Sequence, residues 1–320
     1  MKVIKSKDSK VTKYVHEDGS ETVIKTNNSC SNEIDKQTGK VKVIEKDRNK
    51  FSMFISSSYG CPLGCKFCYL TNRDIKFRKL SSSQIIENVK EAITCEANNN
   101  STIRRKYIKL SWMGMGDAFL LDPLDLRTTT EKILSFAIGD YGCATGLDGV
   151  DISTVFPKNN SGWPHQLALL NDRLSDKYRL NNYSEGRSIV RLFYSLHLPT
   201  NRKSLIPCSR FNSPIPDLSL INKFSKWYGI NVVLHHMFLN GVNDSESDLD
   251  GVSNIINNVI ENAELRILRY NSYEGSVFKE SDNVEDLISE YSKRLPKVKY
   301  QVSHGDDINA ACGLFNGDYE

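Results

Sequence analysis

The stretch FSMFISSSYGCPLGCKFCYL, residues 51–70, joins a short apolar segment to three closely spaced cysteines. Residues 51–58 have the length and apolar content of a buried β-strand. A proline and two glycines then bend the chain around the cysteines. In folds that alternate strands with helices, the loops that follow the strands carry the ligand-binding side chains. The stretch therefore predicts a functional loop at the carboxyl end of a first core strand.

The strand pattern returns five more times along the chain. The six strand candidates are residues 51–58, 107–116, 149–156, 191–198, 230–239 and 263–271. Amphipathic helical stretches separate them, as in residues 82–93, where isoleucine and valine recur with helical spacing behind a serine cap. This alternation predicts parallel βαβ units in an α/β fold, arranged as an open sheet or as a partial (β/α)6 TIM-type barrel.

The first fifty residues have a different pattern, which predicts a small antiparallel β extension. The strand-like segments 11–16 and 21–26 flank the dipeptide Asp18-Gly19, a hairpin signal, and a third segment covers residues 40–46. We therefore expect residues 1–50 to form an N-terminal β-hairpin extension. Residues 51–320 would form the core, which ends in a C-terminal segment that contains Cys312.

Composition excludes several classes of protein. With 39% hydrophobic and 25% charged residues, the 320-residue chain is typical of a globular protein with a sizeable core. No apolar run reaches the roughly 18 residues of a membrane span, and the charged N-terminus does not resemble a secretory signal. We therefore expect a cytoplasmic protein without membrane association. A net charge of +3 permits an anionic partner but does not require one.

The chain has eight cysteines, and their distribution argues against a disulfide framework, which is typical of small secreted domains. Cys61, Cys65 and Cys68 are more consistent with a metal centre, because their spacing lets one loop direct three thiolates at one point. A structural zinc site would need a fourth ligand, and the chain has no second CxxC or HxxxH motif. An iron–sulfur cluster with three cysteine ligands would instead leave one iron open to a bound molecule.

The segment CPLGCKFC, residues 61–68, resembles the CxxxCxxC signature of radical S-adenosylmethionine (SAM) enzymes. Further segments resemble one branch, the RlmN and Cfr methyltransferases, which modify C2 or C8 of an adenine in 23S ribosomal RNA; RlmN also acts on transfer RNA. The resemblance runs from about residue 11 to residue 317. Its pieces are MGMGD (113–117, where the family has MGMGE), DIST (151–154), YSLHLP (194–199), GVND (241–244), RYN (269–271) and GDDINAACG (305–313).

This resemblance implies a radical SAM barrel in which the three cysteines hold a [4Fe-4S] cluster and SAM ligates the fourth iron. It also implies that RNA is the substrate, that a flavodoxin or ferredoxin supplies electrons, and that the protein is a monomer. Family positions that contact SAM correspond here to Gly116, Asp117, Ser153, Ser195, Leu196, His197 and Asn271. For Asp117 and Asn271 an ordinary turn with a solvated polar side chain remains the alternative.

Cys312 and Glu21 are the catalytic residues that the resemblance implies. In the family, the cysteine that ends the ACG motif is methylated by a first SAM, and a radical from a second SAM takes hydrogen from that methyl group. The resulting methylene radical adds to the adenine carbon, so Cys312 would be a covalent carrier. The alternative for Cys312 is a buried, small apolar residue. Glu21 resembles a family glutamate that is proposed to accept a proton.

Three departures from the family pattern qualify this prediction. Phe54 stands where the family has the thiol that resolves the covalent RNA adduct. About twenty extra residues separate Glu21 from the cysteine motif; they include Cys30, which either replaces the resolving thiol or is incidental. The chain also lacks room for the family's N-terminal helical RNA-binding domain, so RNA contacts would come from the core or from a partner.

Two groups of cationic residues are candidates for the RNA contacts, although such runs of charge more often form solvent-exposed faces without a ligand. They are Arg73, Lys76, Arg78 and Lys79 after the cysteines, and Arg104, Arg105 and Lys106 before the second strand. The alternative function is a radical SAM enzyme on the same scaffold with a different substrate or outcome, because no thiol occupies position 54.

Overall fold

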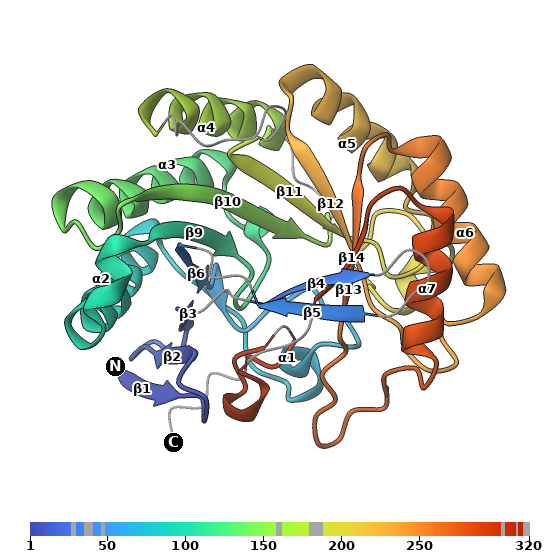
Figure 1. The fold of residues 1–320 in the computed structure, drawn as a ribbon, viewed down its shortest axis with the longest axis horizontal. Coiled ribbons are helices and arrows are strands. Elements are labelled where there is room, and N and C mark those ends of the chain that lie inside the picture. Colours follow the sequence, from blue (N-terminus) through green and yellow to red (C-terminus); the bar gives the residue numbers. More distant parts are fainter. Residues whose placement is uncertain are drawn as a thin grey trace.

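The computed structural model describes residues 1–26, 30–34, 41–45, 49–157, 162–178, 188–301, 305–311 and 313–315, and for 30–34 and 41–45 only the backbone. Within these residues, twelve strands form one curved sheet in the order β1-β2-β3-β6-β9-β10-β11-β12-β13-β14-β4-β5 (Figure 1). None of the described helices is long and apolar enough to cross a membrane.

Seven parallel strands form the barrel, and each is hydrogen-bonded to the next. They are β6 (Lys50–Ile55), β9 (Tyr107–Trp112), β10 (Gly146–Thr154), β11 (Val190–Ser195), β12 (Asn231–His236), β13 (Glu264–Leu268) and β14 (Val298–Gln301). Six helices cover the outer face: α2 (Ser82–Asn99), α3 (Pro123–Leu134), α4 (Trp163–Lys177), α5 (Ile215–Tyr228), α6 (Glu246–Val259) and α7 (Val284–Arg294). The prediction of a partial TIM-type barrel is confirmed, with β14 and α7 as additions.

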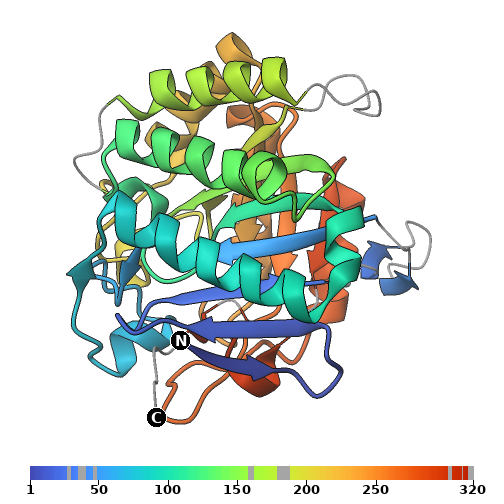
Figure 2. The ribbon, with the colours of Figure 1, turned by 90° about the vertical axis from the view of Figure 1, so that its left-hand side faces the viewer.

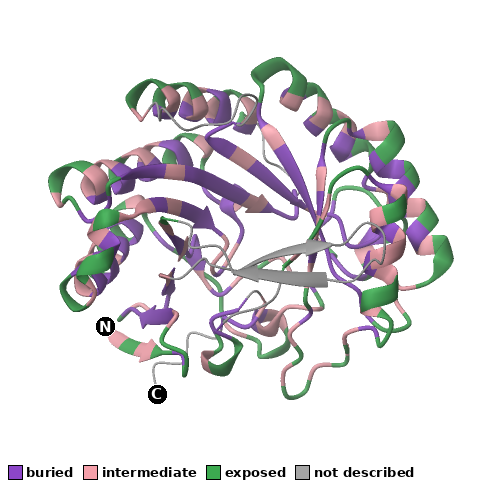
Figure 3. Cartoon of the chain, in the orientation of Figure 1, coloured by how far each residue is buried: buried purple, intermediate pink, exposed green. Residues whose placement is uncertain are grey.

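Apolar side chains between the strands and the helices form the main core (Figure 3). Helix α2 shows how the sequence determines one of these helices. Ser81 accepts from the Gln84 amide in a capping box at its start, and the predicted apolar stripe is buried. On the strands, alternate residues such as Leu110, Ile152 and Leu192 enter this core. Their neighbours on the other face point into the barrel, where the site is built.

A charged layer fills the barrel interior below that site. Asp151 Oδ2 lies 2.5 Å from Lys109 Nζ, and Arg191 Nε donates to Asp151 Oδ1 over 2.8 Å. Burial alone would raise the pKa of Asp151, but Arg191 and Lys109 hold it below its usual range. Ser153 lies two residues after Asp151, near the carboxyl end of β10. Because side chains two residues apart on a strand point to the same face, Ser153 faces the barrel interior next to this charged layer, where the site begins.

The N-terminal strands extend the barrel sheet on one edge. β1 (Lys2–Lys5), β2 (Val11–Val15) and β3 (Glu21–Lys25) are antiparallel, and β3 pairs with β6. The predicted hairpin signal is confirmed, because Gly19 adopts a φ of +77° in the turn between β2 and β3.

The extra residues between β3 and β6 contain a second hairpin, β4 (Cys30–Ile34) and β5 (Val41–Glu45). β4 pairs antiparallel with β14, the last parallel strand, at the opposite edge of the sheet. This hairpin and the loop that carries the cysteines lie at opposite ends of the barrel (Figure 2). The insertion therefore adds strands to the far edge and leaves the carboxyl ends of the parallel strands free for the site.

Candidate active site

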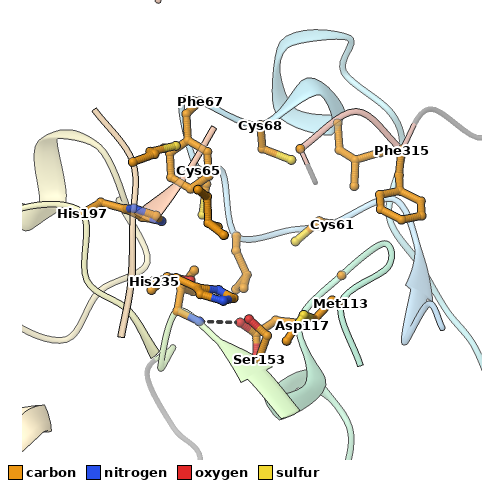
Figure 4. A pocket seen from close by; sticks show the side chains of 18 of the residues that line it. Cys61, Cys65, Phe67, Cys68, Met113, Asp117, Ser153, His197, His235 and Phe315 are labelled. Carbon is orange, nitrogen blue, oxygen red and sulfur yellow. Dashed lines mark hydrogen bonds between the residues drawn. The ribbon is translucent and has the colours of Figure 1, made fainter. Parts of the chain in front are cut away.

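A cavity of about 1110 Å³, including its open mouth, lies at the carboxyl ends of the parallel strands (Figure 4). Its lining combines the three cysteines with the glycine loop after β9 and with the ends of β10, β11, β12 and β13. The predicted residues that line it are Cys61, Cys65, Cys68, Gly116, Asp117, Ser153, Ser195, His197 and Asn271.

The cysteine loop is closed by a small antiparallel sheet of β7 (Ser58–Tyr59) and β8 (Arg78–Lys79). Gly60 has a φ of +64°, and a Cβ there would lie 2.7 Å from the Lys76 carbonyl oxygen, so only glycine fits this crossing. Cys68 precedes the short helix α1 (Tyr69–Asn72), and its amide donates to the Cys65 carbonyl over 3.0 Å. This compact loop directs all three thiols toward the cavity.

The three thiols sit in an apolar environment. Burial raises the pKa of Cys61 to about 12 and also raises the pKa of Cys68. Thiolates at these positions therefore need a positively charged metal group to stabilise them. Among the described residues, no three His, Cys, Asp or Glu side chains lie close enough together to hold a single metal ion.

Cys208 is a fourth thiol beside the loop, and no sequence motif singles it out because it stands alone in the chain. The Cys65 thiol donates a hydrogen bond to the Cys208 sulfur, which raises the pKa of Cys65 and lowers that of Cys208. The Leu205 carbonyl anchors the same segment by accepting from the Lys66 amide over 3.0 Å. Cys208 itself is not among the residues that line the cavity.

The MGMGD segment packs tightly on the serines before the cysteine loop. A Cβ on Gly116, which has a φ of +86°, would lie 2.2 Å from Ser58 Oγ and 2.5 Å from Ser57 Oγ. Asp117 follows, with only 7% of its surface exposed. Its Oδ1 accepts from the Phe119 amide over 2.8 Å, and its Oδ2 accepts from the Val155 amide over 2.7 Å. The alternative of a solvated turn residue does not describe Asp117.

Burial raises the pKa of Asp117 to about 6, so the side chain is a carboxylate at neutral pH. Each carboxylate oxygen accepts one backbone amide, and the Thr154 side chain makes a further hydrogen bond to the carboxylate, which leaves lone-pair capacity for another donor. Asp117 can therefore offer negative charge to a cationic group in the cavity while it links the β9 loop to the end of β10.

His197 follows β11 in a left-handed conformation with a φ of +52°. Its ring contacts Phe67 edge-on at a centroid distance of 5.0 Å, and burial holds its pKa well below the usual value. A neutral imidazole therefore faces the cavity. Leu196 is fully buried and is not among the lining residues; its amide donates to the His235 carbonyl over 2.8 Å.

Arg202 is a positioning residue that the sequence did not reveal, because its partners come from distant segments. It is fully buried, and it donates to the Val155 carbonyl over 3.1 Å and to the Leu196 carbonyl. Its guanidinium also lies 4.7 Å from the centre of the Tyr194 ring. Arg202 thus ties the end of β10 to the end of β11, where two predicted SAM-contacting segments meet.

Glu21 lies outside the cavity lining and is completely buried. Lys13 Nζ is 3.3 Å from Glu21 Oε1 and 3.5 Å from the Asn309 carbonyl oxygen. This buried ion pair therefore contacts the segment that leads to Cys312. Ser56 Oγ also donates to the Glu21 carbonyl over 2.6 Å, which joins β3 to the strand end before the cysteine loop.

Cys312 lies outside the described residues, and so does the side chain of Cys30. The neighbour of Cys312, Gly313, is described: it lines the cavity, and its carbonyl accepts from the Tyr69 amide over 3.1 Å. Phe315 lines the cavity as well. The C-terminal segment on the far side of Cys312 therefore borders the same cavity as the three cysteines.

Phe54, at the position of the family's resolving thiol, packs in an apolar cluster that also includes Cys61, Met115, Ala310 and Phe315. The aromatic ring thus occupies apolar space between the cysteine loop and the C-terminal segment.

Among the known proteins that match this chain are a distant relative by sequence and a solved structure with a similar fold. No family model matches the chain. The dual-specificity RNA methyltransferase RlmN of Helicobacter hepaticus is 28% identical over 284 residues, which cover 87% of this chain and 68% of that protein. The crystal structure of a radical SAM methyltransferase from Sphaerobacter thermophilus has a TM-score of 0.68 at 20% identity and covers 99% of this chain and 81% of its own. The structural match agrees with the barrel fold described above.

Proposed function

The chain is a distant relative of RlmN among the radical SAM proteins, and on that basis we propose that it methylates an adenosine carbon in RNA through a methyl group carried on Cys312. The observation that carries this proposal is the shared cavity. Three cysteines from one loop line it together with Gly313, the residue after Cys312. The cysteine motif and the carrier segment are separated by more than two hundred residues in the sequence, yet the fold brings them to one place.

Cys61, Cys65 and Cys68 would hold a [4Fe-4S] cluster, and SAM would fill the adjoining space. When bound, the cluster supplies the electron that cleaves SAM reductively, and a flavodoxin or ferredoxin would feed it. The apolar lining near the cysteines excludes water, which protects reactive species from side reactions. The residues present fit such a cluster, because each cysteine would bind as a thiolate and the cationic centre would offset the negative charge that burial disfavours.

The polar residues around the cavity would orient SAM. The Asp117 carboxylate would accept from the SAM ammonium group, and Gly116 lets the backbone approach the ligand closely. Ser153, Ser195 and neutral His197 would face the ribose and the carboxylate, and Leu196 would contribute only its backbone. Asn271, at the mouth, would contact the adenosyl part.

Cys312 would act as the covalent carrier, and Glu21 as the acceptor of the proton that leaves the adenine carbon. Glu21 is buried outside the cavity lining, where it forms an ion pair with Lys13. Because Lys13 also contacts the Asn309 carbonyl, the same ion pair would fix the approach of the carrier segment.

A second candidate is a radical SAM enzyme on the same scaffold with a different outcome. Phe54 favours this candidate, because the resolving thiol of the family is replaced by an aromatic ring packed beside Cys61. Such an enzyme would cleave SAM but release its product without a thiol at position 54.

The experiment that separates these candidates uses anaerobically reconstituted protein with SAM, a reductant and ribosomal or transfer RNA. The methyltransferase proposal expects S-methylated Cys312 and methylated adenosine in mass spectra. Cleavage of SAM with neither product would support the second candidate. A Cys312→Ala variant serves as control, because it should keep the cluster and lose both methylated species.

A further inference from the structure

Two arginine–tyrosine pairs lie on either side of the cysteine loop, outside the cavity. The Arg73 guanidinium lies 5.4 Å from the centre of the Tyr69 ring, and the Arg78 guanidinium lies 5.4 Å from the centre of the Tyr59 ring. Tyr69 also packs edge-on against Tyr273 at 5.2 Å. Both pairs border the loop whose residues line the cavity. We call Tyr59, Tyr69, Arg73, Phe77 and Arg78 the rim.

An open hollow of about 850 Å³ adjoins one of these pairs. Tyr59, Lys76, Phe77 and Arg78 form one side, and residues 17–19 form the other. The Gly19 backbone packs against the Tyr59 ring, since a Cβ there would lie 2.6 Å from it. Phe77 remains 44% exposed, so its apolar ring faces solvent in a site that has room for a flat ligand.

The segment that follows the cysteine loop carries an excess of positive charge, which suits an anionic ligand. Residues 72–79 include four cations and one acid, and all four cations are exposed: Arg73, Lys76, Arg78 and Lys79. The opposite wall carries two acids: Glu17, which is exposed, and Asp18, which accepts from Asn88 Nδ2 over 2.9 Å and from the Ser20 amide over 2.8 Å. The Asp18 carbonyl accepts from Arg78, which leaves the remaining guanidinium donors available.

We propose that the rim binds the nucleotides that flank the modified adenosine, with Phe77 as a stacking platform for one base and the rim cations as phosphate ligands. The inference rests on the proposed function, in which RNA is the substrate. A carbon atom of an adenine reaches a cavity in a barrel only after the base leaves its stack, so its neighbours lose a stacking partner. Exposed aromatic rings and arginine planes replace that partner in proteins that bind single-stranded RNA.

The test compares rim variants with matched controls in the reconstituted enzyme. The probe is a fluorescein-labelled RNA hairpin with an unpaired adenosine in its loop, titrated by anisotropy at several salt concentrations. Phe77→Ala is matched by Trp227→Ala, which removes a 77% exposed ring on helix α5. Arg78→Gln is matched by Lys226→Gln, which removes an exposed cation on the same distant helix. Iron content and SAM binding, measured for each variant, check that the site remains intact.

The proposal expects Phe77→Ala to weaken RNA binding by about 5- to 100-fold. Arg78→Gln should weaken RNA binding and lower the slope of log affinity against log salt concentration by about one, the value expected for one lost phosphate contact. Both controls should stay within about twofold of the parent. If the parent methylates RNA while the rim variants match their controls, the rim inference fails and the proposed function stands. If the parent neither binds nor methylates any RNA, both fail.

Discussion

The contact between the MGMGD loop and the serines before the cysteines can be tested by adding one methyl group at Gly116. The new Cβ would lie 2.2 Å from Ser58 Oγ and 2.5 Å from Ser57 Oγ, at a φ of +86°. Ser57 Oγ donates to the Asp117 carbonyl over 3.0 Å, and Ser58 Oγ donates to the Gly60 carbonyl over 2.8 Å. Gly116→Ala must therefore displace the Ser57 hydroxyl, which joins the two loops, and the Ser58 hydroxyl, which stabilises the turn before the cysteines.

The expected loss of unfolding free energy is about 3 kcal/mol: about 1 for the left-handed backbone and about 1 for each disturbed hydrogen bond. Gly229→Ala isolates the backbone cost, because Gly229 has a φ of +63° and nothing within 4 Å of its Cβ position. Its expected cost is about 1 kcal/mol. Gly139→Ala, at a helical position with equally open surroundings, should be neutral or stabilising by up to about 1 kcal/mol.

Urea denaturation followed by circular dichroism measures the three free energies, and equilibrium dialysis with labelled SAM measures binding. Gly116→Ala should be the least stable variant and should also weaken SAM binding, since Asp117 follows directly. If its stability equals that of Gly229→Ala and its SAM affinity equals that of the parent, the tight packing of these loops is not important for the site.

Three further predictions concern the site. Cys65→Ala should abolish incorporation of a four-iron cluster, whereas Cys208→Ala should retain it, because Cys208 hydrogen-bonds Cys65 but would not be a ligand. Iron and sulfide analysis together with visible absorption measures the cluster content. Equal loss of the cluster in both variants would contradict a three-cysteine site. SAM affinity should fall as pH falls through about 6, because Asp117 becomes protonated and loses the charge that attracts an ammonium group. Asp117→Asn should bind SAM weakly at pH 8, and its SAM affinity should no longer change with pH around 6. If the variant has the same pH dependence of SAM affinity as the parent, Asp117 does not contribute to SAM binding. Arg202→Met should leave the Val155 carbonyl without its buried donor and remove one of the two donors to the Leu196 carbonyl, which also accepts from the Leu198 amide. Thermal unfolding should then show a loss of unfolding free energy of about 2 to 4 kcal/mol, and a loss under about 1 kcal/mol would exclude the positioning role.

The barrel could be predicted from sequence because its signal is local. Each parallel strand from β6 to β13 is a short apolar run, and each helix between them has a 3.6-residue stripe. β14 was missed because its four residues are only partly buried and alternate in exposure. The pairing of β4 with β14 was missed for a different reason. The two strands lie more than 250 residues apart, and nothing in the sequence of either strand indicates which strand it pairs with.

The residues of the site also differ in whether they could be predicted from the sequence. The three cysteines, Gly116 and Asp117 lie in compact motifs, so their convergence could be expected from strand order alone. Cys208 and Arg202 stand alone in the sequence, and their roles depend on contacts that only the folded chain creates. The rim had a partial signal in the cations of residues 73–79, but its aromatic partners became apparent only from their positions around the cysteine loop.

In the proposed reaction, Cys312 carries the methyl group that ends on an adenosine carbon. The most direct test supplies SAM with a trideuterated methyl group to the reconstituted enzyme, a reductant and RNA under anaerobic conditions. The account predicts a methylated Cys312 peptide and a methyladenosine that retains two deuterium atoms, because one is removed from the S-methyl group and a solvent proton replaces it. An adenosine that retains all three deuterium atoms, or methylation that persists in Cys312→Ala, would contradict the account.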